Sequence, residues 1–292
     1  MLNRRDLLKS AAALPAAAAF ASQAPGPAQL KARIRPAICA YSFRKELESK
    51  TMSYADLVRL AAGLNVDGLD LTVYWFPDTT DAFLMPLKRL AYRHNIDIYS
   101  ISVRTEMTRE TPELRAKEVE GIREWVDVAS KLGARHIRVF GGRVPKGVTE
   151  DQAADWVVEV LKRSAEYAAQ KGVVLGLENH GGITEHSSRV LDMIKRVDSP
   201  WVGMNLDTGN FRTDVYNQIE RCIPHAVAVQ VKVEITEDGK RQPSDWDRVI
   251  SMFGKANYRG YMALEYESSE PAPTAVPKLI HRLGALCSKY SG

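Results

Sequence analysis

The chain has 292 residues, of which 45% are hydrophobic and 26% charged, with a formal net charge of +4 at pH 7. This is the composition of an ordinary globular protein, and the length allows one large α/β domain or two average domains. The small net charge excludes a basic stripe for nucleic acid and a polybasic patch for a membrane surface.

The N-terminal segment reads as an export signal. Residues 1–21 contain the paired arginines Arg4 and Arg5, followed by an alanine-rich apolar stretch of about 11 residues, too short to span a bilayer. Paired arginines before such a stretch predict bacterial twin-arginine (Tat) export with cleavage near residues 21–24, and a disordered tail is the alternative. We therefore expect a periplasmic or secreted protein that uses the Tat export machinery and has no stable membrane anchor. Residues 22–32 should form a flexible linker, and removal of the signal leaves a net charge of about +2.

The cysteines give little information about function. Cys39, Cys222 and Cys287 are odd in number, widely spaced and without the spacing of a metal site. An exported protein could pair two of them, but the pattern favours buried free thiols.

The remainder of the chain alternates short β-branched runs with longer stretches of helical period. Helices are predicted over Thr111–Leu132 and Thr149–Lys171, and Gly133 and Gly172 mark their ends. Strands are predicted over residues 37–43, 68–73, 97–103, 136–140, 173–178, 202–207, 227–233 and 261–267. Eight strands, each followed by a helix, predict an α/β fold, a single-domain (β/α)8 TIM barrel over residues 33–290. A doubly wound sheet that binds a nucleotide typically has a glycine-rich phosphate-binding turn after the first strand, and none is present there.

Alternation within each predicted strand separates a helix-facing side from an interior side. In the strand over residues 227–233, the four valines should face the helices, whereas Gln230 and Lys232 should face the interior. The same alternation places further polar residues inside, most of them toward the carboxyl ends of their strands: Asp70, Thr72, Tyr74, Arg104, His136, Arg138, Glu178, His180, Asn205, Asp207, Glu265 and Glu267. A TIM-barrel enzyme assembles its active site at that end.

Acidic and amide groups at the ends of four successive strands suggest a cation site. A single acidic residue at a strand end is commonly a helix cap or a rim ion pair, and Asp207 could simply begin a turn. Glu178, Asp207, Gln230 and Glu265 form a larger pattern. Because converging carboxylates raise one another's pKa values unless a cation neutralises them, we expect a divalent metal here.

Four segments carry a family resemblance: "GLENHGG", "GMNLDTGN", "VQVKVE" and "YMALEYE", in this order. They resemble the xylose isomerase-like TIM-barrel family, part of the sugar phosphate isomerase/epimerase superfamily, over essentially the whole mature chain. In epimerase-type members, Glu, Asp, His and Glu from the last four strands hold a metal. The resemblance implies that Glu178, Asp207 and Glu265 are metal ligands and places Gln230 at the histidine position. Asn210 stands where epimerases often have a second histidine.

The glutamine alters the metal that the site should prefer. Its carbonyl oxygen is a hard, neutral ligand, so the first shell would consist of oxygens alone and favour Mn²⁺ or Mg²⁺ over Zn²⁺. His180 as a fifth ligand would weaken this preference. Otherwise His180 should contact substrate or support Glu178.

The resemblance implies a metal-dependent isomerase or epimerase that acts on a small carbohydrate through an enediolate. Glu178 and Glu265 would be the catalytic acid/base groups as well as metal ligands. Lys232 would neutralise an oxyanion or orient substrate, or else form an ion pair with Glu265 or Glu267. Further candidate substrate-binding residues are His180, Asn210, Arg104 and Arg138, with weaker candidates in Asp70, Tyr74 and Trp75.

Two other functions stay open at this point. A metal-dependent lyase or deglycosidase would use the same groups to expel a substituent from a keto-glycoside, and export favours such a substrate. A non-catalytic barrel would keep the pocket for carbohydrate binding only. An endonuclease is the least favoured function because the sequence shows neither a histidine-rich multi-metal site nor a basic groove. Substrate, stereochemistry and homo-oligomeric state are left open.

Overall fold

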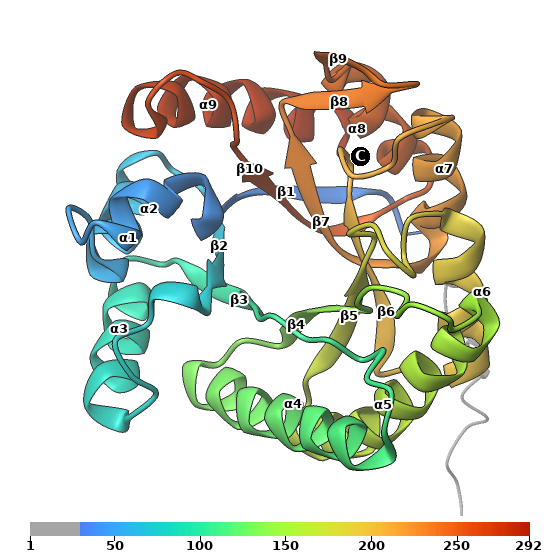
Figure 1. The fold of residues 1–292 in the computed structure, drawn as a ribbon. Coiled ribbons are helices and arrows are strands. Elements are labelled where there is room, and N and C mark those ends of the chain that lie inside the picture. The colour runs from blue at the N-terminus through green and yellow to red at the C-terminus, as the bar shows by residue number, and fades with distance from the viewer. Residues whose placement is uncertain (1–29) are drawn as a thin grey trace, which may run out of the picture. The chain divides into compact units, whose positions relative to one another are not determined.

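The computed structural model describes residues 30–292, so the predicted signal and residues 22–29 of the predicted linker lie outside the described residues. Eight parallel strands close into a barrel in the order β1-β10-β7-β6-β5-β4-β3-β2, and helices surround them (Figure 1). This confirms the predicted (β/α)8 TIM barrel.

The barrel strands are β1 (Arg33–Cys39), β2 (Gly68–Thr72), β3 (Asp97–Ser102), β4 (His136–Phe140), β5 (Val174–Glu178), β6 (Val202–Asp207), β7 (Ala226–Lys232) and β10 (Arg259–Glu265). The helices are α1 (Arg44–Glu48), α2 (Tyr54–Gly63), α3 (Asp81–Arg93), α4 (Pro112–Leu132), α5 (Glu150–Lys171), α6 (Ser187–Val197), α7 (Val215–Cys222), α8 (Trp246–Lys255) and α9 (Ala272–Tyr290). Cys39, Cys222 and Cys287 are buried free thiols, as predicted.

The two longest helices begin and end where the sequence predicts. The Thr111 hydroxyl accepts a hydrogen bond from the Leu114 amide at 3.3 Å, which caps α4. Thr149 caps α5 in the same way. Gly133 and Gly172 end these helices in the left-handed conformation, at φ 86° and 68°.

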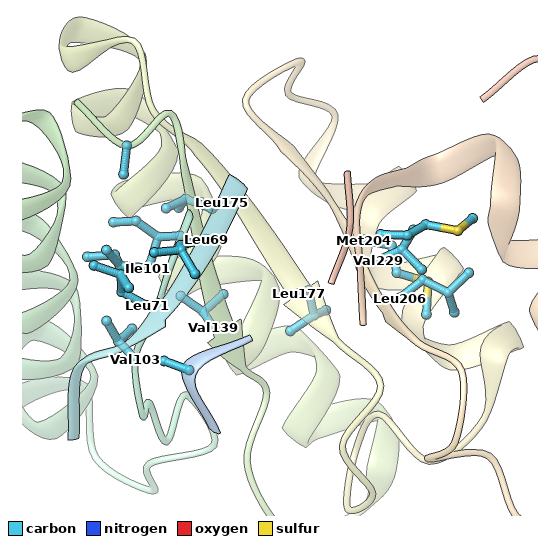
Figure 2. Packing of buried hydrophobic residues seen from close by; sticks show 14 of the residues in the cluster. Leu69, Leu71, Ile101, Val103, Val139, Leu175, Leu177, Met204, Leu206 and Val229 are labelled. Carbon is cyan, nitrogen blue, oxygen red and sulfur yellow. The ribbon is translucent and has the colours of Figure 1, made fainter. Parts of the chain in front are cut away.

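Alternate strand residues pack into two separate apolar layers. The outer layer lies between strands and helices and includes Leu69, Ile101 and Leu177 (Figure 2). A small inner cluster fills the barrel below the polar residues and consists of Ala37, Cys39, Tyr99, Ala228, Tyr261 and Ala263. The predicted division into two faces is therefore confirmed.

The helix-facing side of β7 departs from the prediction at one valine. Val229 and Val231 are fully buried in the outer layer, but Val227 is 40% exposed. Met204 pairs with Ala226 and Asn205 pairs with Ala228, so Val227 is an extra residue in the ladder. The prediction for Val227 is wrong because such a bulge takes a side chain out of the regular alternation.

The first strand lies four residues earlier than predicted. β1 ends at Cys39, and Ala40–Phe43 form a short 3₁₀ helix. The Ser42 hydroxyl holds this turn: it donates to the Leu264 carbonyl and accepts from the Tyr266 amide, both at 2.9 Å. The turn aims Tyr41 at the carboxyl end of the barrel.

A second departure is an antiparallel hairpin after β7, formed by β8 (Glu234–Glu237) and β9 (Lys240–Pro243). Asp238 and Gly239 connect the strands with φ values of 49° and 78°. An Asp-Gly pair is the usual sequence of such a two-residue turn, so this signal was present in the sequence.

Candidate functional site

A pocket of about 470 Å³ opens at the carboxyl ends of the barrel strands. Seven of the predicted site residues line it: Arg104, Arg138, Glu178, His180, Asn210, Lys232 and Glu265. Asp207 and Gln230 do not line it, because they are 0% and 1% exposed beneath its floor. The pocket has the size of a small-molecule site and an unusually charged lining.

Glu178 and Arg138 form a buried ion pair at the pocket floor. Arg138 Nε lies 3.0 Å from Glu178 Oε2, and both side chains are under 5% exposed. Asn210 donates to the other carboxylate oxygen at 3.1 Å. Burial nevertheless raises the pKa of Glu178 well above its ordinary value, against the opposing effect of Arg138. Arg138 is itself fixed by the Tyr74 hydroxyl, 3.1 Å from Nη1.

Lys232 lies among three carboxylates, two on the neighbouring strands and one just after β10. Its Nζ is 3.4 Å from Asp207 Oδ2 and 3.4 Å from Glu265 Oε1, and it also pairs with Glu267. The ion pair with Glu265 or Glu267, one of the two predicted roles of Lys232, is therefore present with both residues. These carboxylates raise the pKa of Lys232 well above its ordinary value although burial opposes them.

Glu265 has the features of a group that exchanges a proton. Burial raises its pKa to about 7, and Lys232 only partly opposes this effect. Its Oε2 is buried and has no hydrogen-bond partner among residues 30–292. A carboxyl group that titrates near neutral pH suits general acid/base catalysis.

Gln230 belongs to a polar layer beneath the pocket. Its Oε1 accepts from Asn205 Nδ2 at 2.8 Å, and its Nε2 donates to Asp70 Oδ2 at 3.1 Å. Ser102 donates to both oxygens of Asp70, at 2.8 and 3.0 Å. Asp70 is thus a buried hydrogen-bond acceptor beneath the pocket, and Gln230 bridges it to Asn205.

The contacts of this site do not fit the predicted divalent metal. The Lys232 ammonium lies between Asp207 and Glu265, two of the four predicted ligands. Arg138 forms an ion pair with the third predicted ligand, Glu178. The Gln230 oxygen, the fourth, is directed to Asn205. Among the residues that the structure describes, no group of three or more His, Cys, Asp or Glu is arranged to hold a metal ion. The carboxylates that would bind the metal are already paired with the cationic side chains of Lys232 and Arg138.

Four aromatic side chains line the pocket: Tyr41, Tyr74, Phe140 and His180. The Arg104 guanidinium lies 3.9 Å from the centre of the Tyr74 ring, and Tyr41 is stacked on Trp75 at 6.0 Å. The His180 ring lies against Phe140, with the ring centres 4.0 Å apart and the planes tilted by 30°. Burial, followed by the charge of Arg138, lowers the pKa of His180 to about 4. His180 is therefore a neutral, aromatic contact group at physiological pH.

Several pocket residues were missed by the sequence analysis: Tyr41, Phe140, Gly209, Arg212, Val233, Glu234, Ile235, Thr236 and Arg241. Tyr41 was hidden by the early end of β1. The hairpin residues follow from the Asp-Gly turn, and Arg241 pairs with Glu234 across it. The Asp238 amide donates to the Arg212 carbonyl at 2.9 Å, which ties the hairpin to the loop after β6.

Comparison with known families gives two matches. The family described as "Xylose isomerase-like TIM barrel" matches residues 58–286. The signal sequence of the twin-arginine translocation pathway matches residues 1–21, which supports export to the periplasm or secretion. Within residues 30–292, none of the helices combines the length and apolar character needed to cross a membrane. No curated protein matches the sequence.

Solved structures share the fold at low sequence identity. D-psicose 3-epimerase with D-tagatose, from Clostridium cellulolyticum H10, is 17% identical with a TM-score of 0.69, over 88% of this chain and 97% of that one. The IOLI protein with a binding zinc atom is 14% identical with a TM-score of 0.73, over 88% and 99%. 3-keto-D-glucoside 4-epimerase YcjR from E. coli, apo form, is 14% identical with a TM-score of 0.68, over 87% and 99%.

Proposed function

The chain belongs to the xylose isomerase-like TIM barrel family, and on that premise we propose that it is an isomerase or epimerase of a sugar or related polyol. The observation that carries the proposal is the pair of buried carboxylates, Glu178 and Glu265, at the floor of one pocket. Both have raised pKa values, and each lies beside a fixed cation. Such a pair is suited to moving a proton on a carbon next to a carbonyl group.

The proposed reaction begins with proton removal by Glu265. The Glu265 carboxylate accepts the proton from the carbon next to the substrate carbonyl, and negative charge develops on the carbonyl oxygen. Lys232 Nζ lies 3.4 Å from Glu265 Oε1. It can therefore donate a hydrogen bond to the carbonyl oxygen of the substrate and stabilise the enediolate. Return of the proton to the former carbonyl carbon, while the proton of the adjacent hydroxyl passes to the former carbonyl oxygen, gives an isomer. Delivery of a second proton to the opposite face of the same carbon, by Glu178 in its protonated form, gives an epimer, which leaves Glu265 protonated and Glu178 as a carboxylate beside Arg138.

The metal-dependent form of this reaction, with Mn²⁺ or Mg²⁺ on Glu178, Asp207, Gln230 and Glu265, stays a prediction from the sequence. The contacts of Gln230 and Lys232 argue against it. We therefore base the proposed chemistry on the protein cations alone.

A lyase acting on a keto-glycoside is the second candidate. It begins with the same proton removal and then expels a substituent two carbons from the carbonyl. Two observations favour it: the export signal, since glycosides are plausible substrates outside the cytoplasm, and the fold shared with an epimerase of a 3-keto-D-glucoside.

The test is incubation of the mature chain in deuterated water with free ketohexoses and, separately, with 3-keto-glycosides. Deuterium uptake at the carbon next to the carbonyl, without loss of a substituent, supports the isomerase. Release of the aglycone supports the lyase. Calorimetric binding without either reaction would show a carbohydrate-binding barrel and refute the enzyme proposal.

Variants identify the groups that act. Glu265→Gln should lower turnover about 10²- to 10⁴-fold, while substrate binding measured by calorimetry is kept. Glu166, exposed on α5, provides the matched control, and Glu166→Gln should leave turnover unchanged. An equal loss in both variants would contradict the assignment of Glu265.

A further inference from the structure

We infer that the Lys232 ammonium group takes the part of the divalent metal in this barrel, so that the site excludes a metal and uses a cation of its own chain. The role of this cation in the reaction rests on the proposed function, but the exclusion of metal does not. The inference rests on the position of Lys232, on how that position is built, and on the engagement of the other predicted ligands.

The barrel register places Lys232 level with the acidic residues. Lys232 is the ladder partner of Glu265 on β10. On the other side, β6 ends at Asp207, which pairs with Gln230. A side chain that extends upward from position 232 therefore lies between the ends of β6 and β10. Its Nζ is equidistant, at 3.4 Å, from Asp207 Oδ2 and Glu265 Oε1.

The stem of Lys232 is held rather than loosely placed. Its amide donates to the Thr208 hydroxyl at 3.1 Å, and its carbonyl accepts from the Trp246 indole at 2.8 Å. The stem lies against Gly209, where a Cβ atom would come within 2.5 Å of Lys232 Cγ. A larger residue at 209 would displace the lysine, so this glycine is needed for the close approach.

A divalent metal on the same oxygens would be close to the ammonium group. Carboxylate–metal bonds measure about 2.0–2.6 Å, so an ion bound to Asp207 Oδ2 would lie at most about 6 Å from Nζ. Like charges at that separation disfavour each other strongly in a buried site. Arg138 adds a second cation at Glu178. The Gln230 amide, which would have to supply the fourth donor, is held by Asn205 and Asp70.

The inferred role has a chemical consequence. An ammonium group presents three donors and one positive charge, which suffices to hold one developing oxyanion but does not chelate two oxygens. The substrate should therefore be gripped at its carbonyl oxygen by Lys232, while its other hydroxyl groups contact the aromatic and polar walls. Inhibition by carboxylate or phosphate analogues should depend on Lys232.

Metal titration of the mature chain tests the exclusion without any substrate. After treatment with EDTA, the parent protein is titrated with MnCl₂ and with ZnCl₂ by calorimetry and by thermal shift. We expect no saturable binding and a change in Tm below about 1 °C. One metal bound per chain at micromolar affinity would overturn the inference.

Variants at positions 232 and 230 test whether Lys232 is the residue that excludes the metal. The double change Lys232→Met with Gln230→His removes the ammonium and supplies an imidazole, and we expect it to bind Mn²⁺ or Zn²⁺ at least about 100-fold more tightly than the parent. Lys232→Arg should exclude metal as the parent does, and so should the control Lys240→Met on the exposed hairpin strand β9. A folded double variant, verified by circular dichroism, that still binds no metal would refute the role of Lys232.

Failure of this inference and failure of the proposed function give different results. If the chain is inactive and binds no metal, the exclusion of metal is supported and the proposed enzyme activity is refuted. If the chain is an isomerase that loses turnover in EDTA and regains it with Mn²⁺, the proposed activity is supported and the exclusion of metal is refuted.

Discussion

Replacement of Gln230 by glutamate tests whether this side chain belongs to the layer beneath the pocket. Gln230 Nε2 lies 3.1 Å from Asp70 Oδ2, and both residues are 1% exposed. Two ionised carboxylates at that separation would repel each other by about 5 kcal/mol at an effective dielectric constant of about 20. In Gln230→Glu we therefore expect the new carboxyl group to keep its proton and donate it to Asp70.

The retained proton lowers stability in a manner that depends on pH. In the unfolded chain the new carboxyl group ionises with a pKa of about 4.3, whereas repulsion raises its folded-state pKa to about 8. The native protein then binds more protons than the unfolded chain, so the free energy of unfolding falls as pH rises between these values. The loss should be about 1 kcal/mol at pH 5 and about 4 kcal/mol at pH 7, and it should level off near pH 8.

Urea denaturation at pH 5, 6, 7 and 8 measures this slope. Gln230→Met should cost about 3 kcal/mol, with no added pH dependence, because it leaves Asn205 Nδ2 without its acceptor and removes one of the hydrogen bonds to Asp70. Gln152 is exposed on α5, and Gln152→Glu should change stability by less than about 0.5 kcal/mol. A Gln230→Glu protein with the parent's pH slope, or one that Mn²⁺ stabilises, would refute the placement of Gln230.

Three further changes test the electrostatics of the barrel and the helix caps. Burial lowers the pKa of His136 to about 4, so the parent should lose up to about 3 kcal/mol as pH falls from 6.5 to 4; His136→Asn should remove this loss in acid unfolding followed by circular dichroism. Arg138→Met leaves Glu178 buried without its cation and should cost about 3–5 kcal/mol in urea denaturation, with partial recovery in Arg138→Lys. Thr149→Ala removes the cap of α5 and should cost about 1 kcal/mol in thermal unfolding. An unchanged pH profile, urea midpoint or Tm, respectively, would contradict each expectation.

The barrel could be predicted because its signals are local. Most strands show apolar and polar alternation, and the two longest helices, α4 and α5, each have a hydroxyl cap and a terminal glycine, such as Thr149 and Gly172 around α5. These features repeat along the chain in the order that a closed parallel sheet requires. The same alternation correctly placed Glu178, Lys232 and Glu265 at the pocket.

The depth of a side chain inside the barrel was not predictable in this way. Alternation assigns Gln230 and Lys232 to the same interior face but does not say which lies level with Glu265. The strand stagger decides this: Gln230 pairs with Ala263, and Lys232 pairs with Glu265. The partners of Gln230 also come from distant parts of the chain, since Asp70 is 160 residues away. Contacts of that kind follow from the closed fold and not from a local pattern.

The polar interior of β7 therefore has two parts with different tasks, only two residues apart. The lower part, at Gln230, joins neutral amide groups and one carboxylate into a layer that is satisfied within the barrel. The upper part, at Lys232, pairs with Glu265 Oε1, and both side chains line the pocket. Substitutions should separate accordingly: those at 230 should change stability and leave substrate affinity in the folded fraction unchanged, whereas Glu265→Gln should change turnover with little effect on unfolding. A variant at 230 that folds normally and loses turnover would contradict this separation and show that Gln230 and Lys232 belong to one functional site.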